Sequence, residues 1–424
     1  MKLPSEPRIA VIGLGYVGLP LAIAFAQKFP CTGFDIEERR ISELASGYDR
    51  TGEIATEDLR SASVHFSSDE SSLDTCNTFV VGVPTPIDQN NVPDLGALLA
   101  ASHTVGRHLK HGDVVIFEST VYPGATEEIC VPALEETSGL GFNTDFSCGY
   151  SPERINPGDR EHRLASIIKI TSGSNPQAAD YVDALYGQII TAGTHRVSCI
   201  KSAEAAKVIE NVQRDVNIAL MNELAQIFRH LDIDTEEVLK AAGTKWNFIP
   251  MRPGLVGGHC IGVDPYYLAN RAQKAGYFPE LIVASRRIND GMGKVVSAQL
   301  MRLMTQKRIH IVDANILVLG LAFKENCPDL RNTKVAGIVR DLQACNANVD
   351  VFDPWVDPAE AEAELGFALT GSLREAHYDA VVVAVGHQQF REMGIGQIRR
   401  FAKGKSVIFD VKYVFGRNEV DGRL

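Results

Sequence analysis

The chain has 424 residues, of which 45% are hydrophobic and 22% charged, with a formal net charge of −11. This balance is typical of a folded globular protein with two or three domains. The acidic charge argues against nucleic acid or an anionic membrane as the main partner, although a local basic pocket can still bind an anionic small molecule. No apolar run approaches the roughly 18 residues of a spanning helix, so we expect no membrane partner.

The cysteines and the N-terminus indicate a reducing compartment. Eight cysteines are scattered along the chain without a Cys-x-x-Cys pair, which argues against a zinc site and a disulfide framework. The first residues lead straight into a strand pattern without a signal peptide. We therefore expect a cytoplasmic protein that holds no metal.

A glycine-rich turn between a short apolar strand and an apolar helix carries the first functional signal. The strand covers residues 8–12, Gly13-Leu-Gly15-Tyr-Val-Gly18 follows, and the helix covers residues 19–27. A second strand, residues 31–35, ends in Asp35, near the spacing of about 20 residues that dinucleotide-binding folds show. This arrangement predicts a Rossmann domain that binds a dinucleotide.

The residues of this turn have separate expected roles. Gly13 forms the tight turn, Gly15 lets the backbone approach the pyrophosphate, and Gly18 lets the helix pack on the strand. The helix N-terminus then faces the phosphates. We include the intervening Tyr16 and Val17 in the expected cofactor site.

The choice between NAD and NADP depends on Asp35. Its carboxylate would accept hydrogen bonds from the adenosine ribose and repel a 2′-phosphate, which favours NAD. Arg39 and Arg40 follow closely and weaken this preference a little, since an arginine can bind the phosphate. We include Arg40 in the expected cofactor site.

The α/β pattern continues, and polar residues follow its strands. Ligands of such sheets bind beyond the carboxyl ends of the strands, where Thr85, Thr120, Glu153 and Arg154 lie. For either threonine alone, turn or cap chemistry is an equally good explanation. The further strands are expected at residues 78–83, 113–117, 146–150 and 166–170.

One long helix is expected from residue 202 to about residue 231, where apolar residues recur at helical spacing without Pro or Gly. Lys207, Asn211 and Arg214 fall on one stripe of it, and such residues usually lie on a solvated face. Their neighbours are mostly apolar, however, which indicates a largely buried helix. A buried lysine and asparagine need polar partners, so we expect them to line a pocket.

The stretch from Val256 to Tyr267 holds Cys260 just after Gly257 and Gly258, which leave room for a ligand near the backbone. If a helix begins near Cys260, Asp264 lies on the same face. A thiol near a helix N-terminus is readily deprotonated to a nucleophile, and Asp264 could take or hold a proton beside it. A lone cysteine is more often structural, but the density of Gly, His, Cys and Asp here and the cofactor motif favour a catalytic one.

A second α/β part begins near residue 309 without another Gly-x-Gly-x-x-Gly. Lys324 and Arg331 in its first loop could neutralise a diphosphate. The predicted fold class is therefore α/β, with two Rossmann-like parallel-sheet domains joined by a helical central domain that contains the long helix. The predicted domains are residues 1–200, 201–308 and 309–424, and the strands of the last are expected at residues 316–320, 349–353, 380–385 and 407–410.

These features together indicate an oxidation with a covalent intermediate. A simple alcohol dehydrogenase needs a base and no thiol. A nucleophilic cysteine beside NAD suggests aldehyde oxidation through a thiohemiacetal and then a thioester, which water hydrolyses. Lys207 and Asn211 are suited to stabilise the oxyanions of these intermediates.

The chain resembles the UDP-glucose/GDP-mannose dehydrogenase family over essentially its whole length. The motifs that carry the resemblance are Gly13-Leu-Gly-Tyr-Val-Gly-Leu-Pro20, Val83-Pro-Thr-Pro86, Ser119-Thr120, Ser151-Pro-Glu-Arg154, Lys207-Val-Ile-Glu-Asn211, Gly257-Gly-His-Cys-Ile-Gly-Val-Asp264 and Gly320-Leu-Ala-Phe-Lys324 with Arg331. The resemblance implies NAD-dependent, four-electron oxidation of a nucleotide sugar at C6, from alcohol to carboxylate, with two NAD per sugar. It also implies a homodimer built across the long central helix.

The resemblance also implies roles for individual residues. The catalytic set is Cys260 as nucleophile, Lys207 as acid/base or oxyanion stabiliser with Asn211 beside it, Asp264 and Thr120 to position a water, and Glu153 to assist thioester hydrolysis. The expected substrate contacts are Glu153, Arg154, Lys207, Asn211, Arg214, Arg252, Gly257 and Lys324. The expected cofactor contacts beyond the glycine-rich turn are Asp35, Arg40, Thr85, Thr120 and Arg331.

Within the family, His259 and the run from Lys245 to Cys260 resemble the branch that oxidises UDP-N-acetylhexosamines for bacterial capsule, O-antigen and Vi-type polysaccharides. We therefore expect UDP-N-acetylglucosamine, UDP-N-acetylgalactosamine or both as substrates. UDP-glucose and UDP-N-acetylmannosamine are the alternatives. Two remoter ones are a two-electron hydroxyacid dehydrogenase, which has no need of Cys260, and a non-catalytic NAD-binding sensor.

Overall fold

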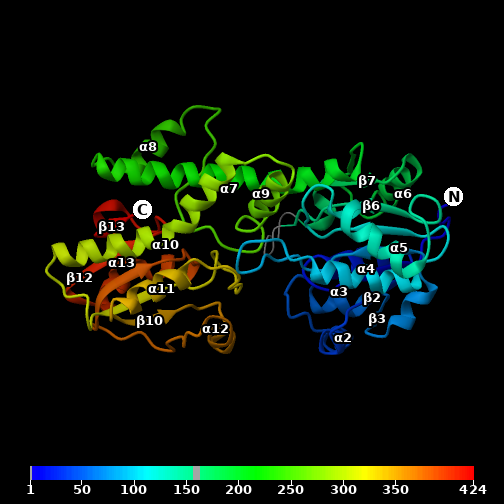
Figure 1. Cartoon of the computed structure of the whole chain (residues 1–424). Coiled ribbons are helices and arrows are strands. Elements are labelled where there is room, and N and C mark those ends of the chain that lie inside the picture. The colour runs from blue at the N-terminus through cyan, green and yellow to red at the C-terminus, as the bar shows by residue number, and fades with distance from the viewer. Residues whose placement is uncertain (1, 156–162) are drawn as a thin grey trace. The chain divides into compact units, whose positions relative to one another are not determined.

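The computed structural model describes residues 2–155 and 163–424, which form two compact units (Figure 1). The first unit comprises Met1–Glu210 and Tyr266–Tyr277, and the second comprises Asn211–Pro265 and Phe278–Leu424. Each unit is built on a sheet of parallel strands, and helices dominate the middle of the chain. The predicted fold class is confirmed.

An eight-stranded sheet in the order β3-β2-β1-β4-β5-β6-β7-β8 forms the core of the first unit. All its pairings are parallel except that between β6 and β7. The central strands are short, apolar and buried throughout, as a parallel sheet covered on both faces requires. The strands are β1 (Ile9–Ile12), β2 (Cys31–Phe34), β3 (Val64–Ser67), β4 (Thr78–Val81), β5 (Val114–Phe117), β6 (Ser147–Tyr150), β7 (Lys169–Gly173) and β8 (Thr194–Arg196).

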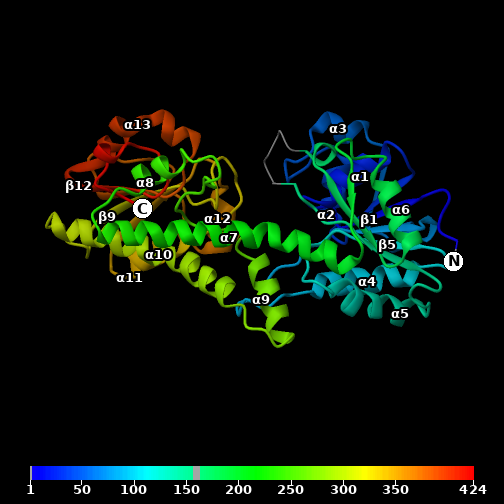
Figure 2. The ribbon, with the colours of Figure 1, turned by 90° about the horizontal axis from the view of Figure 1, so that it is seen from above.

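Helices cover both faces of this sheet. Apolar residues of α1 (Gly18–Ala26) and α6 (Pro176–Tyr186) share one core cluster with β1, β4 and β5. The opposite face carries α4 (Gly96–His108) and α5 (Val131–Ser138) (Figure 2). The remaining helical segments of this unit are α2 (Glu38–Ala45), α3 (Thr56–Ser61), two 3₁₀ turns (Glu70–Thr75 and Leu164–Ser166) and a π turn (Thr126–Cys130).

The predicted long helix is α7 (Ile200–His230), which runs for 31 residues without Gly or Pro. It is followed by α8 (Thr235–Ala242), α9 (Asp264–Lys274) and α10 (Glu280–Gln306). Within the second unit, α10 lies beside the later part of α7, as Figures 1 and 2 show. Buried polar pairs join the two helices: Asn222 donates to Asn289 at 2.8 Å. Among the described residues, no helix combines the length and apolar character needed to cross a membrane.

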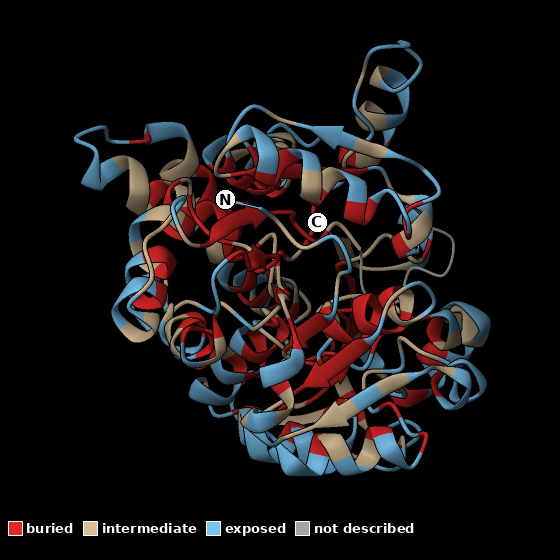
Figure 3. Ribbon diagram, turned by 90° about the vertical axis from the view of Figure 1, so that its right-hand side faces the viewer, coloured by how far each residue is buried: buried red, intermediate tan, exposed pale blue. Residues whose placement is uncertain are grey.

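A five-stranded, fully parallel sheet in the order β10-β9-β11-β12-β13 forms the core of the second unit. Alternate residues of β9 face opposite sides: Ile316 packs with α10 and α11, whereas Leu317 packs with α13. Figure 3 colours buried residues red, and strands are among the buried parts that it shows. The elements are β9 (Asn315–Leu319), α11 (Val335–Ala344), β10 (Asn348–Phe352), α12 (Pro358–Leu365), β11 (Tyr378–Val383), α13 (Gln388–Phe401), β12 (Ala402–Asp410), a 3₁₀ turn (Arg417–Glu419) and β13 (Gly422–Arg423).

The three glycines of the turn after β1 meet different constraints. Gly13 has a φ of +87°, which favours glycine, and a Cβ on Gly18 would lie 1.7 Å from the carbonyl oxygen of Gly13. A Cβ on Gly15 would meet nothing within 4 Å. The protein's own packing therefore requires glycine at positions 13 and 18, whereas the space above Gly15 is available to a ligand.

We predict that Gly15→Ala and Gly18→Ala separate binding from folding. Gly18→Ala should lower the free energy of unfolding by about 2–4 kcal/mol, because α1 must move away from the turn. Gly15→Ala should keep the thermal unfolding temperature of the ligand-free protein and weaken NAD binding by about tenfold or more, a loss of ~1.4 kcal/mol. Thermal unfolding and calorimetric titration with NAD measure the two effects, and unchanged NAD affinity in Gly15→Ala would contradict a close approach there.

Candidate active site

Asp35, directly after β2, is held against the glycine-rich turn. Its Oδ2 accepts the backbone N–H of Leu14 at 2.8 Å, and its Oδ1 accepts that of Glu37 at 3.0 Å. The carboxylate is thereby oriented at the carboxyl edge of the sheet, where an adenosine ribose binds in doubly wound folds.

Arg40 lies beneath the turn and is buried, with 3% of its surface exposed. Its Nη2 pairs with Asp49 at 2.8 Å, and its Nε donates to the carbonyl of Leu14 at 2.9 Å. Although burial opposes it, hydrogen bonds from Thr51 and Arg40 lower the pKa of Asp49. The structure thus places Arg40 as a support of the turn, whereas Arg39 is exposed and pairs with Glu43.

The first turn of α1 fits a pyrophosphate. The helix begins after Val17, which makes no side-chain capping bond within the described part of the chain, so its first N–H groups lack a side-chain acceptor there. Anions bind at such helix N-termini. With the space above Gly15 and the carboxylate of Asp35, this turn has the donors, the room and the acceptor that NAD requires.

The loops after β4 and β5 bring Thr85 and Thr120 together. Thr85 Oγ1 donates to the carbonyl oxygen of Thr120 at 2.7 Å. Tyr267 on α9, which the sequence reasoning did not single out, donates to the carbonyl oxygens of Thr85 at 3.0 Å and Pro86 at 3.1 Å. Its position in an amphipathic helix gave no sign of this contact.

The loop after β6 carries Glu153 and Arg154. Glu153 is buried, and its Oε1 accepts the backbone N–H groups of Arg154 at 2.6 Å and Ile155 at 2.5 Å. The guanidinium of Arg154 pairs with Glu210 on α7 at 2.7 Å and donates to the carbonyl of Ile168 at 2.8 Å. The loop is therefore fixed by its own carboxylate and tied to the long helix.

Lys207 and Asn211 lie one turn apart on α7, and each is only 6% exposed. The expectation that this part of the helix is buried is therefore confirmed. Arg214, on the same predicted stripe, is exposed, and the buried face of α7 continues instead through Asp215 and Asn222.

Cys260 lies in the turn before α9, not within the helix, and is half-buried. The helix begins at Asp264, whose N–H donates to the carbonyl of Cys260 at 2.8 Å. The side chain of Asn211 donates to Asp264 Oδ2 at 2.5 Å, and both side chains are buried. A thiol, a carboxylate and an amide are thus linked through one turn within the second unit.

Two glycines pack this turn against the loop after β9. A Cβ on Gly257 would lie 2.9 Å from the carbonyl oxygen of Asn332, and a Cβ on Gly258 would lie 2.8 Å from the ring of Phe323. The N–H of Gly258 donates to the carbonyl of Arg331 at 3.0 Å, and Asn332 donates back to the carbonyl of Gly258 at 3.1 Å. The cysteine turn and the loop that carries Arg331 therefore form one packed structure.

A buried aspartate and histidine anchor the start of the loop that carries Lys324. Asp353 Oδ2 accepts the N–H groups of Leu321 at 2.6 Å and Ala322 at 2.9 Å. His387 Nδ1 accepts the N–H of Asn326 at 2.9 Å, so its Nε2 carries the proton that points to Asp353 Oδ2 at 3.1 Å. Although burial opposes it, the hydrogen bond from His387 lowers the pKa of Asp353.

The remaining predicted basic residues of the second unit are more exposed. Arg331 pairs with Asp329 through two nitrogens, and its side chain is 40% exposed. Arg252 lies after α8, is 55% exposed and approaches Glu236 at 3.5 Å. Both guanidinium groups remain accessible to an anionic ligand.

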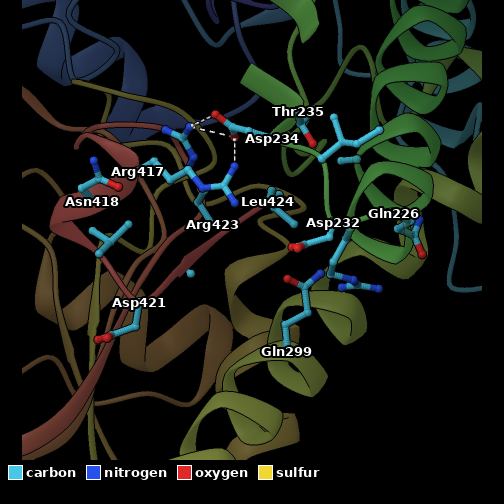
Figure 4. Close-up of a pocket in the computed structure, with 15 residues that line it drawn as sticks. Gln226, Asp232, Asp234, Thr235, Gln299, Arg417, Asn418, Asp421, Arg423 and Leu424 are labelled. Atoms are coloured by element: carbon cyan, nitrogen blue, oxygen red, sulfur yellow. Dashed lines mark hydrogen bonds and ion pairs between the residues drawn. The ribbon is translucent and has the colours of Figure 1, made fainter. Parts of the chain in front are cut away.

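A cavity of about 430 Å³ lies elsewhere in the second unit, between the end of α7, α10 and the C-terminal residues. Arg417 and Arg423 point toward Asp234 in it (Figure 4), and Arg423 pairs with Asp234 and Glu236 at 2.7 Å each. These ion pairs attach β13 to the start of α8. None of the predicted site residues lines this cavity, so we assign it no part in the chemistry.

Comparison with known proteins agrees with these features. The profile of the UDP-glucose/GDP-mannose dehydrogenase family matches in three parts: its NAD binding domain at residues 7–190, its central domain at residues 201–291 and its UDP binding domain at residues 317–417. The UDP-N-acetyl-D-glucosamine 6-dehydrogenase of Pseudomonas aeruginosa is 58% identical over 99% of this chain and 100% of its own length. That of Salmonella typhi is 55% identical over 99% of both chains.

Solved structures show the same architecture. The UDP-D-ManNAc dehydrogenase of Pyrococcus horikoshii superposes with a TM-score of 0.88 at 32% identity, covering 97% of this chain and 96% of that one. With three consecutive family domains and full-length relatives above half identity, the chain belongs to the UDP-glucose/GDP-mannose dehydrogenase family of NAD-dependent enzymes.

Proposed function

We propose that this enzyme oxidises UDP-N-acetylglucosamine, UDP-N-acetylgalactosamine or both at C6, converting the alcohol to a carboxylate with two NAD per sugar. The observation that carries the proposal is the 58% identity, over 99% of the chain, to a relative named UDP-N-acetyl-D-glucosamine 6-dehydrogenase. The uronic acid would serve synthesis of a surface polysaccharide, and the reaction would take place in the cytoplasm.

The residues of the cysteine turn support a covalent route. When bound, NAD supplies the acceptor for the hydride lost in each oxidation step. Cys260 adds as thiolate to the C6 aldehyde carbon, which gives a thiohemiacetal that the second oxidation converts to a thioester. Lys207 and Asn211 donate hydrogen bonds to the oxyanions of these intermediates, and Asn211 is oriented for this by its bond to Asp264.

Hydrolysis completes the reaction. A water held by Thr120 and Asp264 bonds to the thioester carbonyl carbon, and Glu153 accepts the proton that the water loses. The C–S bond then breaks, and the thiolate of Cys260 leaves. Glu153 suits this role because, among the described residues, backbone N–H groups engage its Oε1 and leave its Oε2 without a hydrogen bond.

We propose that the three parts of the chain bind different ligands or carry different parts of the chemistry. Residues 1–200, a Rossmann domain, hold NAD through the glycine-rich turn, Asp35, Thr85 and Thr120. Residues 201–308 carry Cys260 and the long helix, and residues 309–424 bind UDP. Arg154, Arg214, Arg252, Gly257 and Lys324 would contact the nucleotide sugar, and Arg331 would contact the cofactor.

We predict two NADH per sugar consumed, with an N-acetylated substrate preferred. UDP-N-acetylglucosamine, UDP-N-acetylgalactosamine, UDP-N-acetylmannosamine and UDP-glucose should be compared side by side, with NADH followed by absorbance and the acid by mass spectrometry. One NADH per sugar would mean that the reaction stops at the aldehyde, and the role of Cys260 would be wrong. Preference for UDP-glucose would keep the mechanism and overturn the substrate assignment.

The cysteine chemistry has a matched control within the chain. Cys260→Ala should lower acid formation by more than about 1000-fold, the scale of losing a nucleophile. Cys345 is also half-buried but has no proposed role, so Cys345→Ala should retain activity. If Cys260→Ala still formed acid at the wild-type rate, a two-electron hydroxyacid dehydrogenase would become the better explanation.

We also propose a homodimer across α7. Leu220, Ile227 and Leu231 are 48%, 45% and 61% exposed, and their spacing of seven and four residues places them on one face around α7 and its end. Large exposed apolar side chains arranged in this way favour burial against a second copy.

Charged substitutions on this face test the dimer. The double variant Leu220→Glu/Ile227→Glu should elute as a monomer in size-exclusion chromatography with light scattering, because two buried carboxylates would face their copies across the interface. Val312, before β9, is 57% exposed, and Val312→Glu should leave the wild-type mass unchanged. A dimeric double variant would exclude this face.

A further inference from the structure

A buried group of three side chains lies beneath Glu153 in the first unit. Lys169, the first residue of β7, places its Nζ 2.7 Å from Glu118 Oε2 and 3.6 Å from Glu153 Oε2. Tyr186, the last residue of α6, donates its hydroxyl proton to Glu118 Oε1. Glu118 and Tyr186 are fully buried, and Lys169 is 2% exposed.

The two carboxylate oxygens of Glu153 have different surroundings. Its Oε1 accepts two backbone N–H groups, whereas its buried Oε2 accepts no hydrogen bond from any described residue. The ammonium group of Lys169 lies 3.6 Å from that oxygen. The free oxygen is therefore available to a water while an ammonium group stabilises its negative charge.

We propose that Lys169 is a positioning residue for thioester hydrolysis: anchored by Glu118 and Tyr186, it orients Glu153 as the acceptor of the proton from the attacking water. This inference rests on the function proposed above. The step moves one proton from water to Glu153 Oε2 as the C–S bond breaks, and no electrons are transferred.

The charge balance of the group explains why Glu118 belongs to it. Burial raises the pKa of Glu118 from 4.5 to about 7, although the cation of Lys169 opposes this. With both carboxyls ionised and Lys169 charged, the group would carry a net negative charge in a buried setting, which is costly. Protonation of Glu118, which is fully buried, relieves this cost. The positive charge of Lys169 then balances the negative charge of Glu153.

Three elements face the group: Glu118 comes from the end of β5, Lys169 from β7 and Tyr186 from α6. The neighbouring Arg154 is directed to Glu210 on α7. Removing Lys169 therefore removes a positive charge that lies 3.6 Å from Glu153 Oε2.

Substitution of Lys169 should slow hydrolysis selectively. In Lys169→Met, we expect two NADH per active site to form rapidly, followed by turnover at least tenfold slower than in the wild type. The acyl adduct on Cys260 should accumulate and be detected by intact-protein mass spectrometry after acid quench. Lys169→Arg should restore much of the rate.

A second variant controls for the possibility that Lys169→Met does not fold. Lys169→Met leaves Glu118 buried without its cation, so Glu118→Gln/Lys169→Met removes both charges and keeps an acceptor for Tyr186. The double variant should accumulate the same adduct. Glu118→Gln alone keeps Lys169 beside Glu153, so this variant should hydrolyse the adduct faster than either variant that lacks Lys169. A merely structural role of Lys169 would slow every step alike without accumulation of the adduct, and that result would overturn the proposal.

The outcomes also separate this inference from the function it rests on. One NADH per sugar from the wild type would mean that no thioester forms, and the proposed function would fail. Two NADH from the wild type with normal hydrolysis in Lys169→Met would overturn only the role of Lys169. If neither Lys169→Met nor Lys169→Arg folds, accumulation of the adduct in the double variant Glu118→Gln/Lys169→Met decides.

The pH dependence of stability provides an independent test of the buried group. A carboxyl with a raised pKa in the folded state contributes its full stabilisation below its unfolded value, near 4.5, and loses it as the pH rises through about 7. Between pH 5 and pH 8 the unfolding free energy of Glu118→Gln should therefore fall less than that of the wild type, as measured by urea unfolding. An identical fall in both proteins would show that Glu118 does not titrate in this window and would overturn the charge balance described above.

Discussion

The hydrogen bond between Asn211 and Asp264 is the constraint on which the cysteine turn depends. Both side chains are buried, and an unpaired amide or carboxylate there would be costly. Because the N–H of Asp264 also donates to the carbonyl of Cys260, fixing Asp264 fixes the thiol one turn earlier. Gly257 and Gly258 hold the same turn from the other side by close packing against the loop after β9. The thiol is thus positioned by α7 and by the second sheet together.

The sequence predicted those parts of the fold whose pattern is local. The glycine-rich turn, the long helix and the apolar central strands each carry their signal within about ten residues or a clear period. The edge strands β3 and β8 were not predicted, because they are half-buried or exposed and contain His, Ser, Thr and Arg. Their strand conformation follows from pairing with a neighbour distant in sequence, as does the antiparallel pairing of β6 with β7.

The same distinction applies to the candidate site. Cys260, Asp264 and Asn211 were singled out because glycines and helical spacing mark them in the sequence, and the structure brings Asn211 and Asp264 into contact. Tyr267 and Lys169 were not, because their partners lie about 180 and about 50 residues away along the chain, respectively. A lysine within an apolar strand run was the one available signal for the group beneath Glu153, since a buried ammonium needs a carboxylate. Arg40 was read as a phosphate ligand, and its burial against Asp49 could only be seen in three dimensions.

Among the described residues, buried polar pairs support loops at three comparable places. Arg40 with Asp49 lies beneath the glycine-rich turn, Lys169 with Glu118 beneath Glu153, and His387 with Asp353 beneath the loop of Lys324. Buried ion pairs add little net stability, because desolvation offsets their attraction. Each of these pairs, however, supports a loop at the carboxyl end of a strand, where regular sheet hydrogen bonds have ended. Such loops can hold ligands in a fixed geometry only if a rigid part of the protein supports them. A buried pair joined by hydrogen bonds fixes the orientation of its groups more closely than apolar packing does. The pairs are therefore best explained by the demands of the site, with stability as a secondary effect.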